Sequence, residues 1–390
     1  MQTLIELYDE RPLENVLGVE MFHPEKVLYL CPDQIASNHL IHEKLRLYFK
    51  RRGLRSELVF LKANIYDTDA LLALLQNTIA RYPDCALDIT GGTDAMLFAA
   101  GLLCAEVQIP VFTYSRKMNR FYNIKNAPFA DKLPCDVSFT VEDCFMMAGG
   151  SMRAGRVDND SLDSYLCDID PFFSLYMRYR RQWVKAIGYI QRVSACDPDG
   201  NYSLEVLGKY SVKGERASII SAPENILLEL EEIGFISSLR IVPDDSVQFR
   251  FRDGQIRAWL RDVGSVLELK VYKSCLDTKL FQDVRISAVV DWEGPEKVNS
   301  VSNELDVMCT KGVTPIFISC KTCDVRTEAL NELAVLRDRF GGKIAKAAIV
   351  TAERGGAAMR NRAAELNISV IDLNDLTMNL LEKRIRNLVS

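Results

Sequence analysis

The sequence predicts an α/β protein of three units: a Rossmann-like domain (residues 1–140), a winged-helix-like connector (141–252) and a second α/β domain (253–390). Three observations predict this division. Short apolar runs alternate with helical stretches over the first 125 residues, and the middle reads as helices followed by a hairpin. From residue 253 the order begins helix, three strands, helix, strand. At 390 residues, the chain has room for two or three domains.

The N-terminal alternation is typical of a doubly wound parallel sheet. Strands are expected at 26–31, 56–61, 85–89, 111–114 and 120–124, and helices at 35–52, 68–81 and 94–105. In the connector, helices are expected at 139–147, 171–193 and 224–233, followed by a strand at 246–252. In the last unit, helices are expected at 255–272 and 328–339, and strands at 284–292, 303–309, 314–320, 345–351 and 369–372.

Composition narrows the function. The formal net charge is -5, yet residues 251–390 carry 21 Lys and Arg against 19 Asp and Glu, which permits a nucleic-acid substrate. The longest apolar stretch, Ala95–Ala105, is too short to span a membrane, and no signal peptide is visible, so we expect a cytoplasmic protein. The only histidines are His23, His39 and His42, so catalysis elsewhere must use carboxylates, lysine, hydroxyls or a metal.

A glycine-rich turn, Thr90-Gly91-Gly92-Thr93, joins a predicted strand to the helix that starts at Asp94. Glycines let a backbone approach a ligand closely, and the free N–H groups at a helix start favour an anion. It is neither the GxGxxG dinucleotide fingerprint nor a P-loop. The turn therefore predicts a phosphate or carboxylate ligand, with an ordinary strand-to-helix turn as the alternative.

Further polar residues follow other strands of the same predicted sheet. Asp33 and Ser37 follow the first predicted strand, and Tyr114, Arg116 and Lys117 follow the fourth. Ligands of open α/β sheets bind at the carboxyl ends of the strands. We therefore expect these five residues to lie near the glycine turn, with exposed loop cations as the alternative for the two basic ones.

A second cluster lies in the C-terminal unit. A hairpin centred between Lys311 and Gly312 would place Asp306 opposite Phe317, and strand alternation would put four polar residues on one face. These are Glu304, Asp306, Ser319 and Lys321, and Glu268 on the preceding helix can approach the same sheet. A charge in such apolar strands needs a partner.

Two carboxylates and a lysine without histidine suit a hard cation, Mg²⁺ or Mn²⁺. Glu268 and Asp306 would be its ligands, and the backbone carbonyl of Cys320 could join them. Such a metal binds a scissile phosphate and activates water, while Lys321 steadies the attacking hydroxide or the developing charge. The alternative is a buried ion pair at a strand end.

These residues resemble the PD-(D/E)xK nuclease superfamily, whose core is a helix, a mixed sheet and an Asp…(Glu/x)-x-Lys hairpin. The turn in Asp88-Ile-Thr-Gly-Gly-Thr-Asp-Ala-Met96 resembles that of CARF domains, the cyclic-oligoadenylate sensors of type III CRISPR systems. Together with Asn-Glu-Leu-Asp (303–306) and Ile-Ser-Cys-Lys-Thr (318–322), it makes the chain similar to CARF–nuclease effectors over nearly its whole length. This implies a CARF domain at 1–140 and a restriction-endonuclease-like domain at 253–390.

The resemblance implies that cyclic tetra-adenylate binds across a homodimer and switches on metal-dependent cleavage of single-stranded DNA or RNA, or nicking of DNA, in antiviral defence. Asp306, Lys321 and Glu268 match the family's metal and catalytic positions, with Glu304 as a supporting acid. Ser319 departs from the superfamily, which has Glu or Asp two residues before the lysine. The main alternative is a ligand-responsive transcription regulator with an inactive nuclease-like domain.

Overall fold

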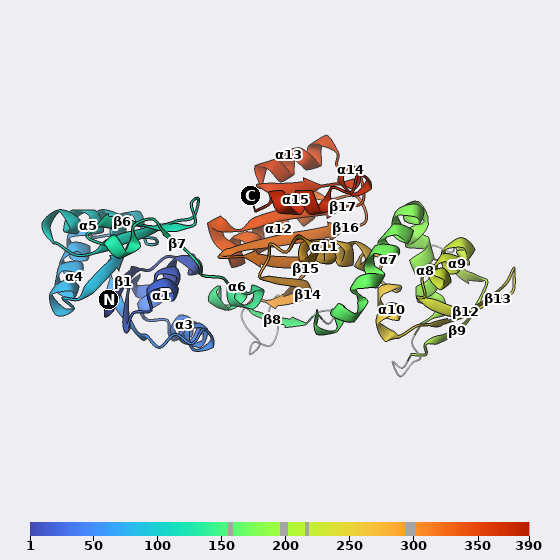
Figure 1. Cartoon of the computed structure of the whole chain (residues 1–390), viewed down its shortest axis with the longest axis horizontal. Helices are drawn as coiled ribbons and strands as arrows, with labels where there is room; N and C mark the ends of the chain where they lie inside the picture. Colours follow the sequence, from blue (N-terminus) through green and yellow to red (C-terminus); the bar gives the residue numbers. More distant parts are fainter. Residues whose placement is uncertain (155–158, 196–201, 215–217, 293–301, 390) are drawn as a thin grey trace.

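In the computed structural model, three bodies follow one another along the longest axis (Figure 1). The N-terminal domain lies at one end, the C-terminal domain in the middle and the predicted connector at the far end. The structure describes residues 1–154, 159–195, 202–214, 218–292 and 302–389. The region expected to connect the two α/β domains therefore lies beyond the second of them, not between them.

The N-terminal domain is built on a seven-stranded sheet, which confirms the predicted Rossmann-like fold. From edge to edge its strands are β3 (Glu57–Ala63), β2 (Lys26–Pro32), β1 (Thr3–Leu7), β4 (Cys85–Asp88), β5 (Val111–Ser115), β6 (Arg120–Lys125) and β7 (Leu133–Pro134). The first five run parallel, β6 pairs antiparallel with β5, and β7 pairs antiparallel with β6. The strand β1, which lies between β2 and β4, was not among the predicted ones, and all five of its residues are buried.

Helices cover both faces of this sheet. They are α1 (Leu17–Phe22), α2 (Asp33–Ala36), α3 (His39–Arg51), α4 (Thr68–Arg81) and α5 (Asp94–Glu106). Leu71 of α4 and Leu103 of α5 pack with Ile5 on one face, whereas Leu17 of α1 and Tyr48 of α3 pack with neighbouring strands on the other. The two apolar layers hold the loops at the carboxyl ends of β1, β4 and β5 in fixed positions.

The C-terminal domain has a six-stranded mixed sheet. Its order is β18 (Ile368–Ile371), β17 (Lys346–Thr351), β16 (Thr314–Lys321), β15 (Ser302–Lys311), β14 (Asp283–Asp291) and β8 (Ser151–Ala154). Its helices are α10 (Gly254–Trp259), α11 (Ser265–Thr278), α12 (Thr327–Gly341), α13 (Ala357–Glu365), α14 (Leu373–Thr377) and α15 (Leu381–Asn387). Residues of α11 and α15 fill one apolar core against the sheet, and those of α12 and α13 fill another.

The strand β8 comes from a part of the chain that the sequence assigned to the connector. It pairs antiparallel with β14, Ser151 lying opposite Asp291. Just before it, α6 (Val141–Met147) packs against β14, β15 and α12. Residues 141–154 thus complete the C-terminal sheet, and the predicted boundary at residue 141 differs from this because strand pairing joins segments that are distant in sequence.

The connector proper contains helices and a small antiparallel sheet, as expected for a winged-helix-like unit. Its helices are α7 (Leu166–Tyr179), α8 (Trp183–Val193) and α9 (Glu224–Glu232). Its three-stranded sheet has the order β12 (Ile236–Val242), β13 (Ser246–Phe251), β9 (Glu205–Lys209), and a two-stranded sheet pairs β10 (Ser211–Lys213) with β11 (Ile219–Ser221). Within the described part of the chain, no helix is both long and apolar enough to cross a membrane.

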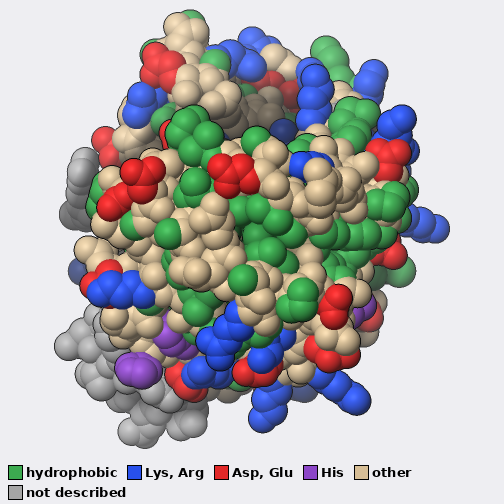
Figure 2. Space-filling model, turned by 90° about the vertical axis from the view of Figure 1, so that its left-hand side faces the viewer, with side chains coloured by type: hydrophobic (Ala, Val, Ile, Leu, Met, Phe, Trp, Pro, Cys, Tyr) green, Lys and Arg blue, Asp and Glu red, His purple; other side chains and the backbone are tan. Residues whose placement is uncertain are grey.

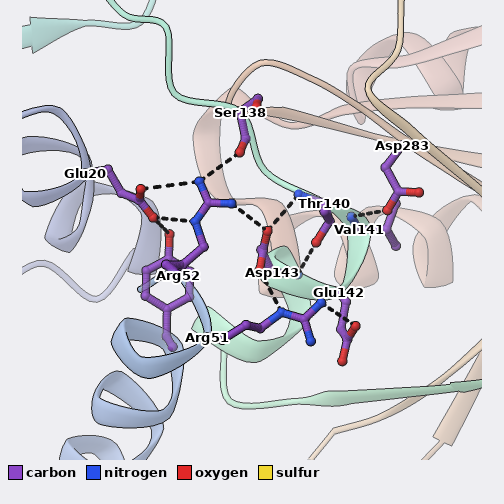
Figure 3. A network of polar contacts seen from close by, with 10 residues as sticks. Glu20, Arg51, Arg52, Ser138, Thr140, Val141, Glu142, Asp143 and Asp283 are labelled. Carbon is purple, nitrogen blue, oxygen red and sulfur yellow. Dashed lines mark hydrogen bonds and ion pairs between the residues drawn. The ribbon is translucent and has the colours of Figure 1, made fainter. Parts of the chain in front are cut away.

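Ion pairs join the N-terminal domain to α6 (Figure 3). Arg52, just after α3, donates to Glu20 of α1 (2.7 Å), to the Ser138 carbonyl (3.1 Å) and to Asp143 of α6 (3.4 Å). Arg51 donates to the other oxygen of Asp143 at 3.2 Å. Asp143 is itself buried and caps the start of α6, so this network fixes the angle at which α6 leaves the first domain.

The start of α6 is also tied to the C-terminal sheet. The backbone N–H of Val141 donates to Asp283 at the beginning of β14, at 2.9 Å (Figure 3). One short helix is therefore held by a carboxylate of the second domain and by two arginines of the first. We identify α6 as a direct structural link between the two α/β domains.

Replacing Arg52 with Ala is expected to lower the free energy of unfolding by about 2–3 kcal/mol, because buried Asp143 and Glu20 lose a shared cation. Urea unfolding of the full chain measures this. The matched control is Arg46→Ala on the same region of α3, because its pair with Glu43 is exposed and should contribute little. Equal effects of the two substitutions would contradict a structural role for the network.

Candidate active site and ligand edge

The hairpin of β15 and β16 places the polar residues of the C-terminal domain. Val307 lies opposite Ile318, and Met308 opposite Phe317, so the predicted pairing of Asp306 with Phe317 is wrong by two residues. The chain turns one position later than predicted, at Gly312 with a φ of 56°, which glycine adopts without strain. Because a two-residue offset leaves every side chain on its original face, the predicted grouping survives the error.

Asp306 is the centre of the cluster. Its Oδ2 accepts hydrogen bonds from the backbone N–H of Cys320 (2.6 Å) and the hydroxyl of Ser319 (3.0 Å), and it lies 3.5 Å from Nζ of Lys321. The paired ladder of β15 and β16 ends one residue earlier, at Val307 and Ile318. The carboxylate of Asp306 therefore lies where the two strands separate, beside the amine of Lys321.

Glu268 approaches from α11 and is 5% exposed, so it is not turned toward solvent. Burial lowers the pKa of Lys321, but the charges of Asp306 and Glu268 outweigh it and hold this pKa above its ordinary value. Burial, with the charges of the two acids, also raises the pKa of the Cys320 thiol well above its usual range. The lysine is thus charged at neutral pH and the sulfur is protonated, which leaves the Cys320 carbonyl as its metal-binding group.

Glu304 lies at the edge of the same site. Its side chain is exposed, and its Oε1 accepts a hydrogen bond from Ser287 of β14 at 2.6 Å. Ser287 is fully buried and has a φ of 53°. Glu304, Asp306, Ser319 and Lys321 line one cavity of about 290 Å³, closed on the other side by α12 residues Ala329, Glu332, Leu333 and Leu336.

The donor set fits a hard divalent cation. Within the described ranges, no three side chains of His, Cys, Asp or Glu are grouped so that they could hold a metal ion. Two carboxylates, Glu268 and Asp306, and the Cys320 carbonyl offer three oxygen donors. Of these three groups, only Asp306 is among the residues that line the cavity. Mg²⁺ prefers oxygen ligands and usually keeps several waters, so an incomplete protein shell suits it.

The glycine turn of the N-terminal domain, Thr90–Thr93, is fixed by hydrogen bonds to neighbouring residues of the same domain. Asp88 Oδ1 accepts hydrogen bonds from the backbone N–H (2.7 Å) and the hydroxyl (2.5 Å) of Thr90. The Thr90 Oγ1 in turn accepts from the Tyr114 N–H at 2.8 Å. Gly92 has a φ of 97°, and a Cβ there would lie 2.7 Å from that of Leu7, so the turn packs directly on the end of β1. Thr93 caps α5 through its side chain.

The other predicted ligand residues gather at the carboxyl ends of the strands, with different orientations. Tyr114 is buried and donates its hydroxyl to Asn119 at 2.7 Å, so its ring belongs to the core. Arg116 is paired with Glu14. Asp33 is paired with Lys62 at 2.6 Å and accepts from Ser37 at 3.3 Å, whereas Asp94 and Lys117 are exposed.

Three charged residues at this edge were not predicted from the sequence. Asp9, Arg11 and Glu14 follow β1, and Gly91 packs against Asp9 and Glu14. They were missed because β1 itself was missed. The apolar run Thr3-Leu-Ile-Glu-Leu7 followed by Tyr-Asp-Glu-Arg was the available signal.

Comparisons with known proteins find one matching domain family and similar folds. Residues 257–388 match the family model of the Card1-like endonuclease domain. Protein VC1899 from Vibrio cholerae has a similar structure, with a TM-score of 0.75 and 17% identity over 99% of this chain and 97% of that one. Can2 from Sulfobacillus thermosulfidooxidans, solved in complex with cyclic tetra-adenylate, gives a TM-score of 0.71 and 17% identity over the same shares. No curated protein matches in sequence.

At this identity the two structures show a shared fold along the whole chain. The predicted resemblance to CARF–nuclease effectors is confirmed, and the C-terminal unit, which carries Glu268, Asp306 and Lys321, is similar to an endonuclease domain. The family match begins within α10 and ends one residue after α15.

Proposed function

We propose that the chain is a metal-dependent endonuclease that cyclic tetra-adenylate switches on in type III CRISPR antiviral defence. Its proposed reaction is the cleavage of single-stranded DNA or RNA, or the nicking of duplex DNA. The observation that carries this is the contact between Asp306 and Lys321 inside a domain that matches an endonuclease family. The fold shared with Can2, whose structure holds cyclic tetra-adenylate, supports the activator.

Each residue of the cluster has a role in this proposal. Glu268, Asp306 and the Cys320 carbonyl would hold Mn²⁺ or Mg²⁺, which supplies positive charge at the scissile phosphate and makes bound water acidic. Ser319 orients Asp306 through its hydroxyl. Lys321 places a positive charge where the phosphate gains negative charge during attack.

Glu304, at the edge of the cavity, is a supporting acidic residue whose carboxylate can accept a proton or guide water. At the ligand edge, the Thr90–Thr93 turn and the start of α5 would receive the activator's phosphates. Asp33, Ser37, Asp94 and Lys117 border this region with exposed polar groups, and Arg116 lies beside it in its pair with Glu14.

The surface of α5 supports a homodimer as part of this proposal. Leu97, Phe98 and Leu102 of this helix are 37%, 61% and 39% exposed. Figure 2 views the end of the molecule formed by the first domain, and hydrophobic side chains form a broad band across it. A two-fold pair through α5 would cover these residues and bring two glycine turns together around one symmetric ring.

Incubation with labelled single-stranded DNA, RNA and supercoiled plasmid, with Mn²⁺ or Mg²⁺ and rings of four or six adenylates, tests the function. Cleavage that needs both a metal and a ring is expected. Equal cleavage with and without a ring would contradict the sensor role. Ring binding without cleavage under any condition would favour a ligand-responsive regulator with an inactive nuclease-like domain.

A further inference from the structure

Two carboxyl groups are buried side by side in the N-terminal sheet, directly below the glycine turn. Glu6 of β1 and Asp88 of β4 are register partners on adjacent parallel strands. Glu6 is 1% exposed and Asp88 is fully buried. Neither belongs to the nuclease cavity or was predicted as a ligand residue, so the site proposed above does not explain them.

Their oxygens converge on one point. A Cβ on Gly18 of α1 would lie 2.5 Å from Oδ2 of Asp88 and 2.8 Å from Oε1 of Glu6. Each of these oxygens is buried without a hydrogen-bond partner among the described residues. Two ionised carboxylates so placed would repel each other in a medium of low dielectric constant, whereas a proton held by one of them removes this repulsion.

Among the described residues, no neighbouring cation or hydrogen-bond donor compensates for the negative charge at these two oxygens. Tyr29 lies beside Glu6 on β2, but its hydroxyl donates to the Asn15 carbonyl at 2.7 Å. On β5, Phe112 lies opposite Asp88, and α1 contributes Gly18. Within the described part of the chain, no Lys, Arg or His forms an ion pair with either carboxyl.

Charged groups also border the turn above the pair. Asp9 and Glu14 pack against Gly91, and they form ion pairs with Arg11 and Arg116. Unlike the deeper pair, these acids therefore have cationic partners.

We infer that Glu6 and Asp88 share one proton, and that this pair is a positioning element of the ligand turn that couples activator binding to pH. The inference rests on the proposed function, since it takes the turn to receive an anionic ring. Burial raises the pKa of Asp88 to about 7, and burial together with the charge of Asp88 raises that of Glu6 well above its ordinary value.

The coupling runs through Thr90. The Oδ1 of Asp88 holds both the N–H and the hydroxyl of Thr90, so a shift of Asp88 moves the turn. Loss of the shared proton adds a second negative charge below the turn, which pushes the two carboxylates apart and repels bound phosphates. By linkage, an anionic ligand strengthens the hold on the proton and binds more tightly at low pH.

The test is the Kd of cyclic tetra-adenylate, measured by calorimetry with the full chain between pH 6 and 9. For the wild type, we expect binding to weaken by up to about tenfold per pH unit once the pair loses its proton. Glu6→Gln offers Asp88 an amide N–H that does not titrate in this pH range, so this variant should give a nearly constant Kd. The control Glu57→Gln removes an exposed acid of β3 and should keep the wild-type slope.

A second measurement needs no ligand. Since the pair holds a proton that the unfolded chain releases near pH 4, the wild-type free energy of unfolding should fall as pH rises from about 4 through about 7. Glu6→Gln should lose that part of the slope. Parallel slopes for both proteins, with tight ring binding, would overturn this inference alone. No ring binding by either protein at any pH would overturn it together with the proposed function.

Discussion

Asp306→Asn should reduce metal-dependent cleavage by at least about 100-fold while the protein stays folded and continues to bind the activator. The amide keeps the shape of the side chain but loses the charge that pairs with Lys321 and would hold the cation. The remaining acid, Glu268, is buried on α11 and would leave the proposed cation with a single carboxylate ligand. Single-turnover cleavage of a labelled strand at saturating metal and ring measures the loss.

Asp338→Asn is the matched control for this substitution. Asp338 lies on α12, the helix that closes the active-site cavity, but its carboxylate is exposed and paired with Arg337. It should cleave at the wild-type rate. A rate within a few-fold of wild type for Asp306→Asn as well would remove the basis for the nuclease assignment.

Phe98→Glu should prevent the proposed homodimer from forming and abolish stimulation by the ring. Phe98 is the most exposed of the three apolar residues of α5, and its burial in each protomer would contribute about 1.5–3 kcal/mol. Two glutamates facing each other across the two-fold axis add repulsion and a desolvation cost. Light scattering coupled to gel filtration measures the mass, and cleavage assays with and without the ring measure the stimulation.

Leu47→Glu controls for surface charge and loss of an exposed apolar group. Leu47 of α3 is 55% exposed and lies outside the α5 face. The substitution should leave both mass and stimulation unchanged. A dimeric Phe98→Glu protein would show that another surface forms the interface.

Local patterns predicted most helices and strands because short-range periodicity reports which face of an element is buried. They missed β1, in which a buried strand carries no polar–apolar alternation and includes a glutamate. The buried position of Glu6 can be interpreted only together with Asp88, its neighbour on β4, which is distant in sequence. Likewise, Ser151–Ala154 has no strand signature of its own and becomes β8 by pairing with β14.

The nuclease cluster was predictable for a different reason. Alternation fixes which side of a strand a residue faces, so Asp306, Ser319 and Lys321 were grouped correctly although the pairing was wrong by two residues. The bond from Ser287 to Glu304 was beyond prediction because it depends on an unusual backbone conformation in the neighbouring strand. Arg116 was expected to face a ligand, and its pairing with Glu14 could not be foreseen without β1.

The origin of β8 bears on how the protein can be dissected. A fragment beginning at residue 253 would contain every proposed catalytic residue, yet it would strip β14 of its outer neighbour. The bare backbone amides and carbonyls of that strand would then be free to pair with other molecules, a familiar cause of aggregation. A nuclease fragment that stays in solution has to include residues 141–154 as well. A short artificial linker would join them to residue 253 in place of the connector.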